Sequence, residues 1–180
     1  MRISIIGTSC SGKTTLAKRV SRELGLEHFE LDSIYWLPNW DSLPKEQFVK
    51  EVSQVADEVE NWVIDGNYKR VREILWQKSN VIIWLNYPFH IVFYRCIERT
   101  FRRAFKQELL FNNNVESIKT SFFSKDSIIL WVLKTYKRRK REYPLMLAEQ
   151  KRLGKVIVEI KHPRFVDSTL EKLMEIRLNG

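Results

Sequence analysis

The segment from Gly7 to Thr14 reads G-T-S-C-S-G-K-T, and it constrains the fold more than any other part of the chain. It matches the pattern G-x-x-x-x-G-K-[ST] in full, and it lies between a short β-rich run and the start of a helical pattern. In such a loop the backbone N–H groups point inward, and the helix that follows adds partial positive charge. The sequence therefore predicts a phosphate-binding loop between a strand and a helix.

This loop predicts a site for ATP and Mg²⁺. We expect Lys13 to reach the β- and γ-phosphates, Thr14 to place its hydroxyl on Mg²⁺, and Thr15 to add a phosphate hydrogen bond. Cys10 is expected to fill space with its backbone contributing; the alternative is an oxidisable thiol, because a helix N-terminus lowers a thiol pKa. The residues predicted to bind the nucleotide are Gly7, Thr8, Ser9, Cys10, Ser11, Gly12, Lys13, Thr14 and Thr15.

The apolar pattern of the rest of the chain predicts strands that alternate with helices. Strands are expected at 2–6, 28–31, 62–64, 81–85 and 156–160, and helices at 12–24, 45–60, 89–106, 128–150 and 165–178, with a short amphipathic stretch ending near 78 and a loop at 32–44. The run Val81–Leu85 is apolar on both faces, which favours a parallel strand covered by helices on both sides. The expected fold is an α/β layered sandwich with a parallel sheet.

Length and composition favour one domain in a reducing compartment. The 180 residues are 44% hydrophobic, which suffices for the core of one domain spanning 1–180. No apolar run approaches the roughly 20 residues of a membrane span, and the apolar start is too short for a secretory signal. Cys10 and Cys96 have neither disulfide-framework nor zinc-site spacing. We therefore expect a cytoplasmic protein with no membrane partner. The histidines are scattered and are expected to be structural: His28, His90 and His162.

Two aspartates follow predicted strands and are candidate site residues. Asp65 ends the run Trp62–Ile64, so its carboxylate should emerge beside the phosphate loop, where it would bind metal or substrate; a turn residue in Asp-Gly-Asn is the alternative. Asp32 follows the second strand with Tyr35 and Trp36 close behind, which suggests a carboxylate at the base of an aromatic pocket. There it would orient an acceptor hydroxyl or take its proton, with a cap or turn role as the alternative.

The net charge of +9 is concentrated in residues 95–141. Arg95 and Arg99 share one helix face, and Arg102 and Arg103 continue it by a turn, so this basic helical region is predicted to act as a lid whose arginines clamp the transferring phosphate. The run Lys137–Arg141 reads K-R-R-K-R and predicts either a solvated helix face or a nucleic-acid patch.

Taken together, these segments resemble the P-loop kinases related to adenylate kinase, and specifically the topology modulation protein family. The resemblance covers nearly the whole chain and rests on residues 7–15, 28–36, 62–68 and 81–88 and on the pair Arg95 and Arg99. It implies a three-layer sandwich with a five-stranded parallel sheet of order 2-3-1-4-5, and lid roles for these two arginines. It also implies that the turn at 162–164 borders the adenine. Asn86 stands where relatives resemble an acidic residue, which leaves Asp65 as the metal-side carboxylate.

Two function classes follow from these observations. The first is an ATP- and Mg²⁺-dependent kinase of a small-molecule acceptor, such as a nucleoside, a nucleotide or another hydroxyl compound, with Lys13, Asp32, Arg95 and Arg99 as catalytic residues and Thr14 and Asp65 on the metal. The second is an ATP-binding, nucleic-acid-associated protein that influences DNA topology, which the basic region and the family name favour. A GTP switch protein is disfavoured, because the sequence has no N-K-x-D motif.

Overall fold

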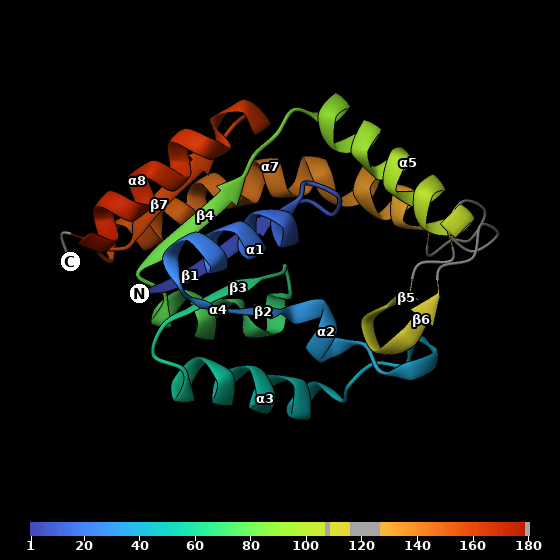
Figure 1. The fold of residues 1–180 in the computed structure, drawn as a ribbon, viewed down its shortest axis with the longest axis horizontal. Coiled ribbons are helices and arrows are strands. Elements are labelled where there is room, and N and C mark those ends of the chain that lie inside the picture. The colour runs from blue at the N-terminus through green and yellow to red at the C-terminus, as the bar shows by residue number, and fades with distance from the viewer. Residues whose placement is uncertain (107–108, 116–126, 179–180) are drawn as a thin grey trace.

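The computed structural model describes residues 1–106, 109–115 and 127–178, and its centre is a five-stranded sheet (Figure 1). Its strands are β1 (Arg2–Gly7), β2 (Glu27–Glu30), β3 (Trp62–Asp65), β4 (Val81–Leu85) and β7 (Val156–Ile160). Every neighbouring pair is parallel and the order is β2-β3-β1-β4-β7, which is 2-3-1-4-5 when only these strands are counted. The predicted α/β fold class is confirmed.

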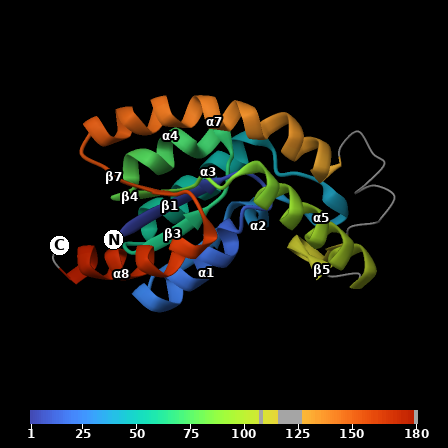
Figure 2. The same ribbon diagram turned by 90° about the horizontal axis from the view of Figure 1, so that it is seen from above.

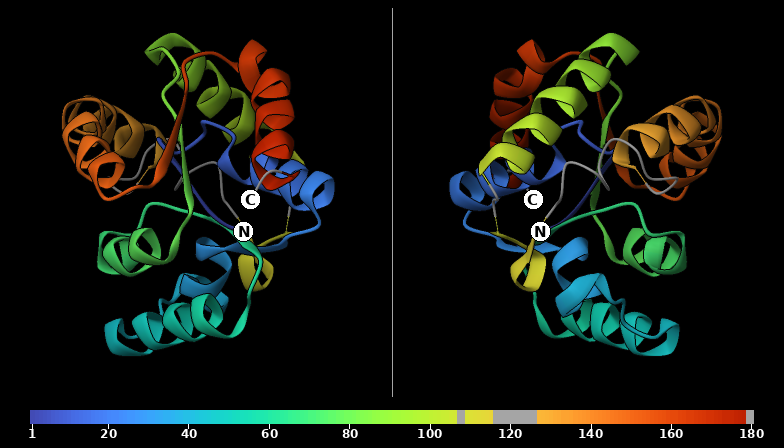
Figure 3. Two further views of the ribbon diagram at one scale, coloured as in Figure 1. Left: turned by 90° about the vertical axis from the view of Figure 1, so that its left-hand side faces the viewer. Right: turned by 90° about the vertical axis from the view of Figure 1, so that its right-hand side faces the viewer.

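Helices cover both faces of this sheet, as Figures 2 and 3 show from three sides. One face carries α1 (Lys13–Leu24) and α8 (Val166–Leu178), and the other carries α3 (Lys45–Glu58), α4 (Lys69–Lys78) and α7 (Ile128–Arg152). The helix α5 (Phe89–Lys106) packs against α7. Shorter elements complete the described chain: α2 (Leu31–Tyr35), the hairpin β5 (Leu109–Leu110) and β6 (Asn114–Val115), and 3-10 helices at Pro38–Trp40, Phe111–Asn113 and Pro163–Phe165.

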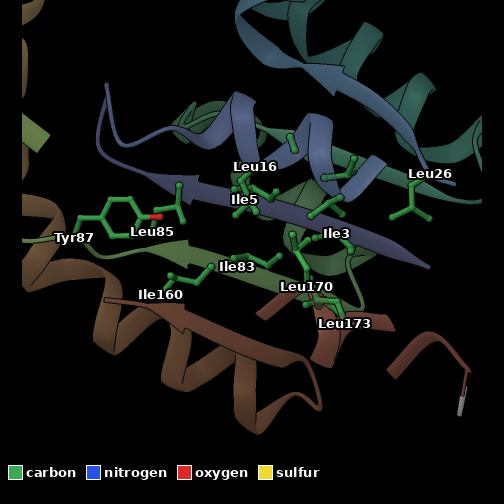
Figure 4. Packing of buried hydrophobic residues seen from close by; sticks show 14 of the residues in the cluster. Ile3, Ile5, Leu16, Leu26, Ile83, Leu85, Tyr87, Ile160, Leu170 and Leu173 are labelled. Carbon is green, nitrogen blue, oxygen red and sulfur yellow. The ribbon is translucent and has the colours of Figure 1, made fainter. Parts of the chain in front are cut away.

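The core follows from the alternation of side chains along buried strands. Ile3 and Ile5 of β1 point toward α1 and α8 and pack with Leu16 and Leu170, as Figure 4 shows. Ile6 points to the opposite face and joins a second cluster there. All five residues of β4 are buried, which confirms the expectation drawn from its continuous apolar run.

The main difference from the predicted elements lies between 31 and 44. Residue 31 was expected to end a strand and 32–44 to form a loop, but Leu31–Tyr35 forms the helix α2, and a 3-10 turn follows at Pro38–Trp40. The reason is tertiary packing: Leu31 is buried against Phe48 and Ile64 in the cluster under α3, which stabilises one helical turn that local propensity does not favour. Asp32 therefore lies on a helix.

Part of the basic region 95–141 lies outside the described residues, at 107–108 and 116–126. Its described hairpin lies beside the segment that follows α2, on the right of Figure 1. Asn114 is buried there: its side-chain amide donates to Leu37 O at 2.8 Å and its Oδ1 accepts from Trp40 N at 2.8 Å. No helix within the described ranges is long and apolar enough to cross a membrane.

Candidate active site at the phosphate loop

The loop between β1 and α1 has the backbone shape that its glycines permit. Gly12 adopts φ 94° and caps α1, a left-handed conformation in which a side chain is strained. A Cβ atom there would also lie 3.2 Å from Arg95 Nη1. Within the loop, Ser11 N donates to Thr8 O at 3.1 Å, and Lys13 Nζ donates to Thr8 O at 3.4 Å. Lys13 therefore reaches back over the loop, where phosphate oxygens would bind.

Residues far away in the sequence brace this loop. Arg95 donates from Nη1 to Ser11 O at 3.0 Å, and its guanidinium lies over the ring of Tyr87 at 5.4 Å. Asn67 meets Gly7 twice: its side chain donates to Gly7 O, and its Oδ1 accepts from Gly7 N at 3.3 Å. Tyr143 of α7 donates its hydroxyl to the same Oδ1 at 3.1 Å. Arg95, expected on the transferring phosphate, thus contacts the loop backbone.

Thr14 lies at the centre of a cluster of carboxylates. Its Oγ1 is 2.9 Å from Asp65 Oδ2 and 3.0 Å from Glu30 Oε1. Asp65 is 1% exposed, and its other oxygen lies 2.7 Å from His28 Nε2. Burial, followed by the charge of Asp65, raises the pKa of Glu30. Glu30 and Asp65 are paired residues of adjacent strands, so they emerge side by side at the carboxyl edge of the sheet.

These oxygens suit a magnesium ion that is shared with phosphates. The described residues contain no group of three or more His, Cys, Asp or Glu side chains arranged to hold a metal on their own. Mg²⁺ is usually held by one or two carboxylates together with substrate phosphates and waters. A hydroxyl and a buried carboxylate beside a phosphate loop match that chemistry, so Thr14 and Asp65 are the residues that would hold it.

Asp32 lies on α2, near enough to Lys13 to act on its charge. The hydroxyl of Tyr68 donates to Asp32 Oδ1 at 2.5 Å, and the ring of Tyr68 packs against Tyr35 at 4.7 Å. Burial lowers the pKa of Lys13, whereas the charges of Asp65 and Asp32 act in the opposite direction. Two aspartates therefore lie close enough to Lys13 to act on its charge, and one of them bonds to a tyrosine that belongs to a group of packed aromatic rings.

Cys10 of the loop lies close to Cys96 and Arg99 of α5. Cys10, with φ 66°, is buried against Cys96 of α5. A hydrogen bond from Cys96, the largest effect, lowers the pKa of the Cys10 thiol to about 7, and Arg99 lowers it further. The buried Nε of Arg99 has no hydrogen-bond partner among the described residues. Arg99 thus contributes positive charge on the α5 side of the loop.

The basic run Lys137–Arg141 is not a uniform face. Lys137, Arg138 and Arg141 are exposed, whereas Arg139 is only 6% exposed and faces the interior. Arg139 lies near enough to Lys13 to lower its pKa. The prediction of a solvated or nucleic-acid-binding face is therefore wrong for this one residue, since α7 turns it toward the loop.

Several residues of this site were missed from the sequence, for two different reasons. Glu30 and Asn67 had a signal, because each stands next to the carboxyl end of a predicted strand. The others depend on how α7 and β2 pack, and the sequence pattern alone did not single them out: His28, Arg139 and Tyr143.

The turn at 162–164 is a capped 3-10 turn. His162 Nδ1 accepts from Arg164 N at 3.2 Å, and the Arg164 guanidinium lies over the ring of Phe165 at 4.7 Å. Contact of this turn with adenine stays a prediction.

Asn86 lies beside an acidic residue of the neighbouring strand. Its side chain donates to Glu159 of β7.

Comparison with known proteins finds structures of similar fold. No family model matches the chain, and no curated protein matches it by sequence. Two shikimate kinase structures are similar, from Aquifex aeolicus (TM-score 0.55, 18% identity, covering 100% of each chain) and from Bacteroides thetaiotaomicron (TM-score 0.57, 19% identity, covering 98% of this chain and 97% of the other). A gluconokinase from Sinorhizobium meliloti has TM-score 0.54 and 15% identity, covering 98% and 95%. The chain therefore has the P-loop NTPase fold that these kinases share.

Proposed function

We propose that the protein is an ATP- and Mg²⁺-dependent phosphotransferase that acts on the hydroxyl group of a small molecule. The observation that carries this proposal is the convergence of four groups at one edge of the sheet. Lys13 reaches back over the loop, Thr14 bonds to Asp65, and both Asp65 and Asp32 lie close enough to Lys13 to act on its charge. These are the groups that a kinase needs for phosphate, metal and acceptor.

Each group has a defined task in this proposal. Lys13 and the loop hold the β- and γ-phosphates. Thr14 and Asp65 would hold Mg²⁺, which when bound would neutralise charge on the phosphate oxygens. Asp32 accepts a hydrogen bond from the acceptor hydroxyl, orients its oxygen toward the phosphorus and receives its proton. Arg95 fixes the loop, and Arg99 adds positive charge as the phosphoryl group moves.

The similar structures support a small acceptor. The enzymes named shikimate kinase and gluconokinase act on small hydroxyl compounds, and both share the fold along nearly the full length of this chain. The ring of aromatic side chains beside Asp32 supports the same conclusion, because Tyr35 lies between Trp36 and Tyr68 in a compact group.

The test is ADP release from MgATP while nucleosides, nucleotides, sugars and hydroxy acids are screened as acceptors. We expect one class to stimulate ADP release and Asp32→Ala to abolish the stimulation. Lys13→Ala should weaken ATP binding at least tenfold, and Lys18→Ala, an exposed lysine of the same helix, is its control. Unchanged ATP affinity in Lys13→Ala would contradict the proposal.

The exposed part of the basic run supports a second candidate, an ATP-binding protein that associates with nucleic acid. Lys134, Lys137, Arg138 and Arg141 are all exposed on α7. This candidate predicts DNA affinity that falls steeply with salt and that weakens when Lys137 and Arg141 are changed to Ala. Arg139 must be left intact in that test, because it is buried at the other site. DNA binding that is unaltered in the double variant would exclude this candidate.

A further inference from the structure

Arg139 is a buried cation without a matching anion. Its side chain leaves α7 toward the phosphate loop and is 6% exposed, and its Nη1 has no hydrogen-bond partner among the residues that the structure describes. Within the same set, no carboxylate lies within ion-pair distance of it. Burial, the largest effect, lowers the pKa of Arg139, whereas the hydroxyl of Tyr143, its polar neighbour, acts in the opposite direction. The nearest charged groups, Arg138 and Arg72, lower the pKa further, because both are cations.

Burying Arg139 in this way would lower the stability of the protein if the residue served only the fold. A buried charge costs several kcal/mol unless an opposite charge and hydrogen bonds compensate for it. The acidic side chains nearest the loop are already occupied elsewhere. Asp65 contacts Thr14 and His28, Glu30 contacts Thr14, and Asp32 contacts Tyr68. The compensating group for Arg139 is therefore expected to come from a ligand.

The structure ties Arg139 to the same side of the site as Asp32. Tyr143, one helical turn after Arg139 on α7, bonds to Asn67. Tyr68, which follows Asn67 in the chain, donates its hydroxyl to Asp32. The adjacent residues Asn67 and Tyr68 thus hold two groups. Asn67 holds the turn of α7 that carries the guanidinium, and Tyr68 holds the carboxylate that is expected to orient the acceptor.

The half-buried arginines of α5 contact a different part of the loop. Arg95 bonds to Ser11, and Arg99 acts on Cys10, so the α5 arginines lie along the loop backbone. Arg139 acts on Lys13, on which Asp32 also acts. The position of Arg139 thus differs from that of the α5 arginines.

We propose that Arg139 binds an oxyanion of the acceptor, a carboxylate or a phosphate, so that the acceptor is an anionic hydroxyl compound. The inference rests on the proposed phosphotransferase function and narrows its substrate class. Asp32 selects the hydroxyl group, and Arg139 selects the negative charge at the far end of the same molecule. A guanidinium is suited to this task because its fork of donors matches the geometry of both oxyanions.

A binding experiment tests this without an identified substrate. The protein is saturated with Mg²⁺ and a non-hydrolysable ATP analogue, so that the γ-phosphate position is filled, and is titrated with malonate and with inorganic phosphate at constant ionic strength. Loss of one charge-assisted, bidentate contact is expected to weaken anion binding about 10- to 100-fold in Arg139→Met. Arg141→Met, an exposed arginine of the same run, should bind like wild type. Arg139→Lys keeps the charge and should lose less affinity than Arg139→Met.

Two readouts separate this role from a structural one. Arg139→Met is expected to melt no lower than wild type, since it removes an uncompensated buried charge while keeping a similar stem. Its affinity for MgADP should also be unchanged. A large fall in melting temperature that Arg139→Lys shares, an unchanged affinity for the anions, or no saturable anion binding by wild type would each overturn the proposal. Weaker binding of the ATP analogue with unchanged anion binding would overturn it as well, because Arg139 would then bind the γ-phosphate.

Turnover with matched acceptors separates this inference from the proposed function. Wild type is compared on pairs that differ in charge, such as glycerate and glycerol, or a nucleoside monophosphate and its nucleoside. We expect transfer to favour the charged member and Arg139→Met to lose that preference. Transfer to neutral acceptors with equal efficiency in both proteins would overturn the anion inference and leave the kinase proposal standing. Arg139-dependent anion binding without transfer to any hydroxyl compound would overturn the kinase proposal and leave the anion site standing.

Discussion

Replacing Asn67 with Ala should reduce both stability and nucleotide affinity. The side chain makes two hydrogen bonds with the backbone of Gly7 and accepts one from Tyr143, and both of these residues are buried. Each buried polar group left without a partner costs about 1–3 kcal/mol, and the variant leaves groups on two residues without a partner, so the free energy of unfolding should fall by about 2–6 kcal/mol. For a domain of this size that corresponds to a fall in melting temperature of roughly 4–24 °C.

Tyr143→Phe is the matched comparison, because it removes only one of these three hydrogen bonds. It should cost about 0.5–1.5 kcal/mol, and Asn67 should still hold Gly7. Asn80→Ala is the control: this asparagine accepts from Arg2 N at 2.8 Å at the opposite end of β1. Its loss should leave nucleotide affinity unchanged.

Urea unfolding and titration with MgADP measure both effects. We expect Asn67→Ala to bind MgADP at least about tenfold more weakly, which is about 1.4 kcal/mol, because the loop is no longer held in its binding shape. The reasoning is refuted if Asn67→Ala and Tyr143→Phe lose the same stability within about 0.5 kcal/mol. It is equally refuted if Asn67→Ala unfolds more easily but binds MgADP as tightly as wild type.

Three further predictions concern the carboxylate cluster and the cysteines. Thr14→Val should bind ADP normally in EDTA but lose most of the gain in affinity that Mg²⁺ gives, since its hydroxyl bridges Asp65 and Glu30; an equal gain in both proteins would contradict this. Burial raises the pKa of Glu30 above its ordinary 4.5, so the folded protein binds more protons than the unfolded chain just above that pH, and the free energy of unfolding falls as the pH rises through this interval. Glu30→Gln should remove that fall in urea unfolding measured from pH 4.5 upward, and a slope that persists in the variant would assign the effect to other groups. Cys10 should react with iodoacetamide with a midpoint near pH 7 and be protected by MgADP, whereas Cys96, whose pKa is raised by its hydrogen bond to Cys10, should stay unmodified in mass spectra; preferential labelling of Cys96 would reverse the assignment.

The strands could be predicted because their signals are local, whereas their order was implied by the family resemblance. The glycine-rich pattern predicted the strand before it and the helix after it, and the continuous apolar run at Val81–Leu85 indicated a strand covered on both faces. Asp65 was predicted at the carboxyl end of a strand beside the loop, and it lies there with its side chain against Thr14. Because the strands are parallel, residues at their carboxyl ends lie at the same edge of the sheet as the loop.

The α7 side of the site could not be predicted, because it depends on the rotation of one long helix. Five consecutive basic residues are similar in sequence, yet only Arg139 faces the loop, and which member of the run does so is decided by the packing of Val132, Tyr143 and Leu147. Helical periodicity was readable there, but Thr135 and Arg139, two of the buried positions, are polar. The helix α2 was missed for a related reason, since Leu31 is buried by residues of distant elements.

The braces of the phosphate loop have a consequence for how the protein folds. The loop begins at residue 7, but the groups that hold it come from Asn67, Arg95 and Tyr143, so its binding shape depends on contacts that span most of the chain. Its strand also pairs with residues about 60 and 80 positions further along. Long sequence separation slows the formation of such contacts. A chain still emerging from the ribosome would therefore carry the complete glycine-rich sequence long before it gained affinity for nucleotide. The appearance of that affinity during refolding would report the last contacts of the fold rather than the first.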